Sequence, residues 1–202
     1  MARYPAIALI EFDSIAVGIK AGDAMVKKAP ITVLKSGTVH NGKFLVFIGG
    51  SVASVSESFE EGLWVGADQI LDRVILPDVH GQVHDAILGK RQKFASDAAG
   101  IIETTTVASM LRSTDAAVKG ADVNIMEIRL ADDLGGKAFA IYSGSLEDVE
   151  MAIDLSREAV SHPEFWLNHT LIPRLHEQMA QQIDHSTYFA HANLDTVEGG
   201  EV

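Results

Sequence analysis

The sequence of 202 residues contains no cysteine. This absence excludes disulfides, thiolate zinc sites, cysteine-ligated iron–sulfur clusters and thiol catalysis. Basic residues are also scarce, because 16 Lys and Arg stand against 28 Asp and Glu, for a formal net charge of −12. Nucleic-acid binding relies on clustered basic side chains that displace counterions, so this composition argues against a nucleic-acid partner.

Long apolar runs are missing as well. No stretch of about 18 apolar residues is available to span a bilayer. The first residues, MARYPAIALIEF, lack the basic region, apolar core and small-residue cleavage site of a secretory signal. We therefore expect a soluble, cytoplasmic protein with no membrane partner. Its apolar content of 47% is enough to build one or two hydrophobic cores at this length.

The two halves of the chain repeat each other. Residues 8–29 (ALIEFDSIAVGIKAGDAMVKKA) align without a gap to residues 100–121 (GIIETTTVASMLRSTDAAVKGA), at an offset of 92 residues and with 8 of 22 positions identical. The match resumes at an offset of 94 for GK at 42–43 and 136–137, and at an offset of 96 for LPDVH at 76–80 and IPRLH at 172–176. A period this long indicates a duplicated domain and not a solenoid repeat.

The repeat predicts the domain organisation. We expect a first domain at residues 4–91, a second at 98–183, and a polar, flexible tail at 184–202. Charge is divided unevenly between the halves. Residues 1–91 carry 9 basic and 10 acidic groups (net −1), whereas residues 92–202 carry 7 and 18 (net −11). Such asymmetry predicts two electrically different faces if the domains stack.

Hydrophobic periodicity predicts the same six elements in each copy. For the first copy these are strands at 7–11, 31–36, 43–48 and 74–76, a helix at 15–28 and a second helix capped by Ser51. For the second copy they are strands at 99–103, 123–130, 137–142 and 165–172 and helices at 106–120 and 146–160. The order β-α-β-β-α-β is that of a ferredoxin-like α+β domain, so the fold class predicted is a tandem duplication of that domain.

Candidates for chemistry are few. Glu11 and Glu103 end equivalent apolar strands, which is compatible with an acid/base carboxylate pair or with two structural carboxylates at a helix start or an interface. The duplication favours the structural interpretation. His80 and His84 have the spacing of two metal ligands on one helix, but no third ligand is evident nearby, so we predict no metal and no cofactor. Trp64 and Trp166 are interpreted as core or interface anchors.

With these motifs the chain resembles the bacterial microcompartment (BMC) shell-protein family, and within it the tandem-domain class. The matching stretches are EFDSIAVGIKAGDAMVKKA, GKFLVFIGGSVASV and LPDVH in the first copy, and GIIETTTVASMLRSTDAAVKGA, GGKAFAIYSG and IPRLHEQM in the second. The resemblance implies two BMC domains and a structural, non-enzymatic role in a microcompartment shell. Members of this class form homotrimers whose six domains mimic a hexamer. These discs tile with other shell proteins, and small metabolites pass through a central pore.

The resemblance also assigns roles to residues. The loop between the second and third strands of each domain lines the pore in this class, which implies pore-lining roles for Val39, His40, Asn41, Gly42, Asp132, Asp133, Leu134 and Gly135. Contacts at the disc edge fall on Lys27, Lys119 and Arg174. A propanediol-utilisation type within the class binds an iron–sulfur cluster through a pore cysteine. His40 stands at that position, so the cluster is not expected here.

Threefold symmetry would place three His40 side chains around the pore axis, as a polar lining or, less favoured, as a zinc-like site. Rings of Asp132 and Asp133, offset in part by Lys43 and Lys137, predict that cations and polar molecules pass more readily than anions. One alternative is a ferredoxin-like ligand-binding or regulatory trimer, with or without a metal at the His40 ring. Another is a small enzyme that uses Glu11 and Glu103.

Overall fold

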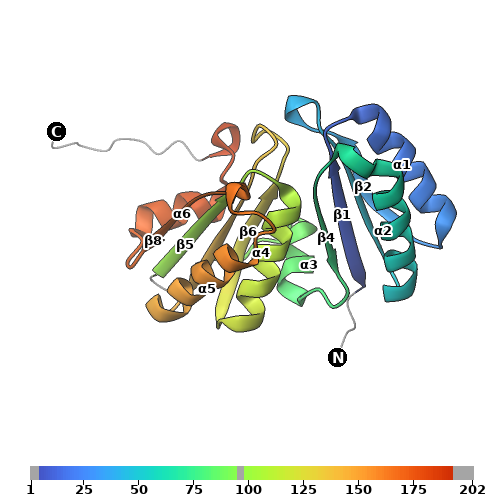
Figure 1. Ribbon diagram of the computed structural model, residues 1–202. Helices are drawn as coiled ribbons and strands as arrows, with labels where there is room; N and C mark the ends of the chain where they lie inside the picture. The colour runs from blue at the N-terminus through green and yellow to red at the C-terminus, as the bar shows by residue number, and fades with distance from the viewer. Residues whose placement is uncertain (1–4, 95–97, 193–202) are drawn as a thin grey trace.

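The first copy is a four-stranded antiparallel sheet with two helices on one face. The computed structural model describes residues 5–94 and 98–192. Strands pair in the order β2-β3-β1-β4, and the helices cover the outer face (Figure 1). The elements are β1 (Ala6–Phe12), α1 (Ile15–Lys28), β2 (Thr32–Thr38), β3 (Phe44–Gly50), α2 (Val52–Gly66) and β4 (Ile70–Leu76).

The second copy repeats this topology with the strand order β6-β7-β5-β8. Its elements are β5 (Ala98–Thr104), α4 (Val107–Gly120), β6 (Val123–Leu130), β7 (Ala138–Gly144), α5 (Leu146–Ala159) and β8 (Trp166–Ile172). Elements begin at the same offsets as the sequence repeat: 92 residues for β1 and β5, 94 for β3 and β7, and 96 for β4 and β8. The predicted tandem ferredoxin-like fold is confirmed.

Hydroxyl side chains start the four main helices. Each accepts a hydrogen bond from a backbone N–H of the first turn, which satisfies one of the amides left without a partner at a helix start. The residues are Ser14, Ser51, Thr106 and Ser145. Because these caps recur in both copies, the helix starts could be read from the sequence.

Each copy also ends in a helix that the sequence analysis did not predict: α3 (Gly81–Ile87) and α6 (Glu177–His185). His80 and His176 are their N-caps, and the Nδ1 atom of each accepts the N–H two residues later at 3.3 Å. His80 and His84 therefore do not lie together on one helix, because His80 precedes α3 and its Nδ1 atom accepts the cap hydrogen bond.

Apolar side chains form two clusters. One lies between α1, α2 and the first sheet and includes Ile10, Met25 and Phe59. The other joins the opposite face of the first sheet, through residues such as Leu9 and Val74, to the interior of the second copy. Helices α3 and α4 lie between the two sheets (Figure 1). The second copy thus shares its core with the first.

The linker and the chain end are attached to the second sheet. Arg91 donates to Glu127 Oε2 at 3.0 Å and to the carbonyls of Ile183, Asp184 and His185 at the end of α6. The Arg129 guanidinium lies 3.5 Å from the Tyr188 ring centroid. Within the segment predicted as a polar tail, residues 184–192 include the end of α6, the 3-10 turn at Phe189–His191 and these contacts with Arg91 and Arg129. Residues 193–202 lie outside the described residues.

Short 3-10 turns occur at His40–Gly42, Ala67–Gln69, Pro163–Phe165 and Phe189–His191. Trp166 packs against the shared core as expected, whereas Trp64 is 78% exposed and is not a core residue. Among the helices that the structure describes, none combines the length and the apolar character needed to cross a bilayer.

Candidate functional site

The two loops proposed to line a pore are shaped by residues that tolerate a left-handed backbone. In the β2–β3 loop Asn41 and Gly42 have φ values of 65° and 74°. In the β6–β7 loop the same region is occupied by Ala131, Asp133, Gly135 and Gly136. Asn, Asp and Gly adopt this conformation at least cost, so the loop composition follows from tight turns and needs no bound phosphate.

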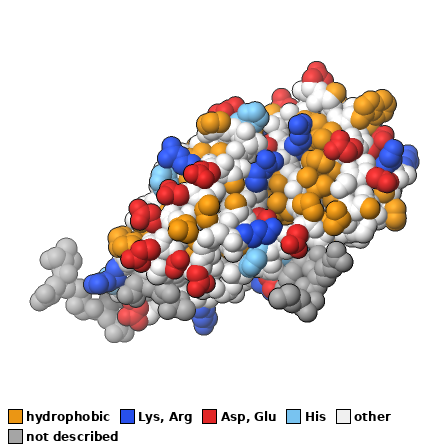
Figure 2. Space-filling view, turned by 60° about the horizontal axis from the view of Figure 1, so that its bottom comes forward, with side chains coloured by type: hydrophobic (Ala, Val, Ile, Leu, Met, Phe, Trp, Pro, Cys, Tyr) orange, Lys and Arg blue, Asp and Glu red, His pale blue; other side chains and the backbone are white. Residues whose placement is uncertain are grey.

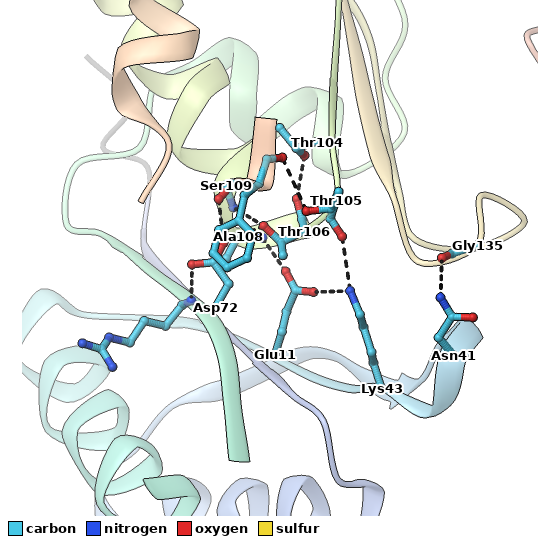
Figure 3. A network of polar contacts seen from close by, with 12 residues as sticks. Glu11, Asn41, Lys43, Asp72, Thr104, Thr105, Thr106, Ala108, Ser109 and Gly135 are labelled. Carbon is cyan, nitrogen blue, oxygen red and sulfur yellow. Dashed lines mark hydrogen bonds and ion pairs between the residues drawn. The ribbon is translucent and has the colours of Figure 1, made fainter. Parts of the chain in front are cut away.

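The structure brings these two loops together. Asn41 Nδ2 donates to the carbonyl of Gly135 at 3.4 Å (Figure 3). A Cβ atom on Gly136 would lie only 3.3 Å from the His40 carbonyl. His40, Asn41, Asp132 and Asp133 are exposed. The loops of both copies therefore present one continuous polar edge, although they are about 94 residues apart in the chain.

Lys35 is the cation beside this edge. Its Nζ atom lies 2.6 Å from Asp132 Oδ2, and both side chains are more than half exposed. Lys43, which the sequence suggested as a neutralising group, is turned inward, where its Nζ lies 3.2 Å from the Thr105 carbonyl and 3.9 Å from Glu11 Oε2. Asp132 is thus partly neutralised, and Asp133 has no ion-pair partner within the described part of the chain.

Behind the loops, a buried polar network joins the two copies (Figure 3). Glu11 Oε1 accepts the backbone N–H of Ala108, in the first turn of α4, at 2.7 Å. Asp72, which faces Glu11 across the β1–β4 ladder, accepts the hydroxyls of Thr106 and Ser109 at 2.6 Å each. Both carboxylates thus hold the start of α4, where the helix dipole favours negative charge.

Burial changes the acidity of this network. Glu11 is fully buried, and the loss of solvation raises its pKa from 4.5 to about 7. The Ala108 N–H and the charge of Lys43 oppose this rise, and the charge of Asp72 adds to it. Glu11 Oε2 has no hydrogen-bond partner among residues 5–94 and 98–192. A buried carboxylate that no solute can reach is suited to holding two domains together and not to acid/base catalysis on a substrate.

Glu103 does not complete a catalytic pair with Glu11. It lies in β5, on the other sheet, at the position equivalent to Glu11. For Glu11, the structural interpretation is therefore the one that the geometry supports. Asp72 was missed by the sequence analysis, although a charged residue inside the apolar strand sequence ILDRVIL is a recognisable signal.

The three proposed edge residues lie at different kinds of surface. Lys27 is exposed and pairs with Asp23 at 2.6 Å. Lys119 makes the equivalent pair with Asp115 at 2.6 Å and also donates to the Asp78 carbonyl of the first copy. Arg174 is exposed. The side chain of Lys119 thus bonds to both copies of the domain, whereas the ion pair of Lys27 is with a residue of its own helix.

Metal or cluster binding has little support in a single chain. Within residues 5–94 and 98–192, no group of three or more His, Asp or Glu side chains is arranged to hold a metal ion. An iron–sulfur cluster does not fit the loop residues, because its iron atoms need thiolate ligands and the sequence has none.

Comparison with known proteins agrees with the duplicated fold. The BMC domain family matches twice, at residues 6–79 and 98–175. The bacterial microcompartment shell protein PduT of Citrobacter freundii is 35% identical over 178 residues, which cover 88% of this chain and 97% of PduT.

Two solved structures are also similar. A microcompartments protein from Desulfitobacterium hafniense DCB is 36% identical with a TM-score of 0.75, covering 88% of this chain and 99% of that one. A fused permuted hexameric shell protein from the RMM microcompartment is 20% identical with a TM-score of 0.56, covering 79% of this chain and 83% of that one; its likeness concerns the fold alone.

Proposed function

Because the chain belongs to the BMC-domain family of bacterial microcompartment shell proteins, we propose that three copies of it form a ring of six domains around a pore. The chain itself is a structural shell protein and not an enzyme. Its assembly with other shell proteins follows from that role. The homotrimer and the pore are proposals that rest on an exposed helix face and an exposed sheet face of the chain.

The observation that carries the trimer is the unequal burial of two equivalent helices. Ile19 of α1 is 56% exposed, whereas Leu111 at the same position of α4 is fully buried. The same contrast holds for the flanking positions, which are Ile15 and Val26 in α1 and Val107 and Val118 in α4. The α4 face is covered by the first sheet, so the α1 face is an apolar surface that lacks the equivalent cover.

The missing cover exists on the second sheet. Val74 and Val83, which pack beside α4, are 2% and 0% exposed, whereas Thr170 and Met179 at the equivalent positions are exposed. Each chain therefore has an exposed face on α1 and an exposed face on the second sheet. These two faces are equivalent to the faces of α4 and the first sheet that pack together within the chain. Such a head-to-tail contact either closes into a ring or continues as a filament. The six-domain plan of the family favours the ring.

A ring of this kind would place the polar edge around its axis. His40 and Asn41 would alternate with Asp132 and Asp133, and Lys35 would offset part of the acidic charge. We expect this lining to pass cations and neutral polar metabolites more readily than anions. The acidic side chains are visibly concentrated over the second copy, on the left of Figure 2.

Ile19→Asp tests the trimer. A charge in the centre of the α1 face should leave the chain folded and monomeric in sedimentation velocity, whereas the natural chain should sediment as a trimer. Met151→Asp is the matched control, because Met151 is 51% exposed on α5 and its equivalent in α2, at an offset of 94, is the polar Glu57. A monomeric natural chain, or a trimeric Ile19→Asp variant, would contradict the proposal.

A further inference from the structure

Glu103 lacks a partner for a role that Glu11 performs. The two residues are equivalent, and Glu103 faces Asn168 across the β5–β8 ladder as Glu11 faces Asp72 across the β1–β4 ladder. Glu103 is half-buried, and no hydrogen bond or ion pair holds its side chain within the described part of the chain. Its carboxylate lies on the sheet face that the ring would cover.

We propose that, in the trimer inferred above, Glu103 accepts the backbone N–H of Ala16 at the start of α1 of the neighbouring chain. This contact repeats the bond between Glu11 and Ala108, but with Asn168 in place of Asp72. At this point of the contact between chains there is one carboxylate, that of Glu103. At the equivalent point within a chain there are two, those of Glu11 and Asp72. The inference rests on the proposed trimer and adds the residues that fasten it.

The start of α1 is prepared for such a contact. Ala16 is the equivalent of Ala108 at an offset of 92, and it is exposed where Ala108 is fully buried. No side-chain acceptor for its N–H lies among the described residues. Ser14 already caps the helix through the N–H of Val17, as Thr106 caps α4 through the N–H of Ser109. The Ala16 amide is therefore the open donor in the same first turn.

The sheet side is prepared as well. Asp72 Oδ1 accepts the N–H of Arg73 at 2.8 Å, and Asn168 Oδ1 accepts the N–H of His169 at 2.8 Å. The two side chains thus make the same local hydrogen bond beside their glutamates. In the single chain, Asn168 therefore already makes the local hydrogen bond that Asp72 makes at the contact between the copies.

A second pair of residues follows the same rule. Asp115 accepts the His80 N–H at 2.8 Å from across the contact between the copies and pairs with Lys119 at 2.6 Å. Asp23 makes the same pair with Lys27 at 2.6 Å but accepts no backbone N–H from another element among the described residues. The N–H of His176, the N-cap of α6, is the equivalent donor. Asp23 should therefore accept the N–H of the partner subunit's His176.

The two contacts differ in strength for a chemical reason. Asp72 accepts the hydroxyls of Thr106, Ser109 and Ser161. Between chains, Asn168 would face Ser14 and Val17 at the positions of Thr106 and Ser109, so one hydroxyl would replace the two that those residues offer. Hydrogen bonds to a carboxylate are stronger than those between neutral groups. The contact between chains should thus be the weaker and more readily reversed of the two.

The test measures trimer dissociation by native mass spectrometry and sedimentation over a dilution series. We expect Glu103→Ala to raise the concentration at which half of the trimers dissociate by about tenfold or more. Glu103→Gln, which keeps an acceptor oxygen and the side-chain volume, should have a smaller effect of the same sign. Adding Asp23→Asn to Glu103→Gln should weaken the trimer further.

Glu150→Ala is the matched control, because Glu150 is an exposed glutamate of α5 away from the proposed contact, and it should leave dissociation unchanged. Circular dichroism checks that each variant is folded. If the natural chain forms trimers and both Glu103 variants dissociate as it does, the inference is overturned while the proposed function stands. If the natural chain forms no trimers at any concentration, the proposed function itself fails.

Discussion

Helices α1 and α4 occupy equivalent places in the two copies and share the pair formed by an aspartate and the lysine four residues later, yet their surroundings are opposite. The apolar face of α4 is buried against the first sheet, whereas that of α1 is exposed. Burial is therefore decided by what each copy is joined to and not by the copy's own sequence. An apolar helix face that is satisfied in one copy and bare in the other indicates a contact that a single chain cannot complete.

The largest expected effect is a loss of stability when a side chain on the buried face of α4 is shortened. Leu111→Ala removes a fully buried side chain from the contact between the copies and should lower the free energy of unfolding by about 3 kcal/mol. Ile19→Ala, at the equivalent position of α1, should change it by less than about 0.5 kcal/mol in dilute monomer. Urea denaturation measures both, and equal losses would contradict the contrast between the helices.

The second effect concerns the pH dependence of the contact within the chain. Because burial raises the pKa of Glu11 from 4.5 to about 7, the folded chain holds a proton in this range that the unfolded chain releases. Glu11 therefore favours folding below pH 4.5, and this contribution is lost as pH rises to about 7, by about 3 kcal/mol in total.

Glu11→Gln should remove that part of the pH dependence. We expect the variant to gain stability relative to the natural chain as pH is raised from 5 to 8, measured by urea denaturation at each pH. Glu150→Gln, at an exposed position, should follow the natural chain. Stability curves that stay parallel for Glu11→Gln and the natural chain would show that Glu11 does not titrate in this way.

A smaller effect is expected at the pore loops, where the copies differ in charge. Asp133→Asn should reduce the preference of assembled shells for a small cation over a small anion severalfold, because no cation among the described residues pairs with this carboxylate. Asp132→Asn should have less effect, since Lys35 already pairs with Asp132. Flux of the two ions through the shells measures the preference, and His40→Asn is the neutral control. Unchanged selectivity in both aspartate variants would refute a lining role for them.

The smallest effect is expected at the disc edge. Lys27→Ala removes an exposed lysine whose ion pair with Asp23 is worth less than about 1 kcal/mol. The chain should fold as before and its trimers should weaken only slightly, because Asp23 keeps its carboxylate, whereas sheets seen by electron microscopy should need a higher protein concentration to form. Lys20→Ala, an exposed lysine of the same helix, serves as the comparison. Sheets that form equally well with Lys27→Ala would remove this residue from the edge.

The repeat made much of the fold predictable, because duplicated caps and apolar periods specify the same elements twice. The offsets of 92, 94 and 96 residues recur in the strands of the structure. Residues whose role depends on the other copy could not be predicted in the same way. Asp72 and Arg91 bind groups 34 or more residues away in sequence, and Lys43 points inward only because Glu11 and α4 are there.

The linker beside Arg91 has a consequence for assembly kinetics. A tether of a few residues holds the two copies at an effective concentration of about millimolar, whatever the amount of protein in the cell. Every second contact around the ring would then form as a first-order step, and only the remaining ones would depend on encounters between molecules. Fusing two domains into one chain thus cuts the number of collisions needed to build a disc by more than half, and it fixes their alternation around the axis.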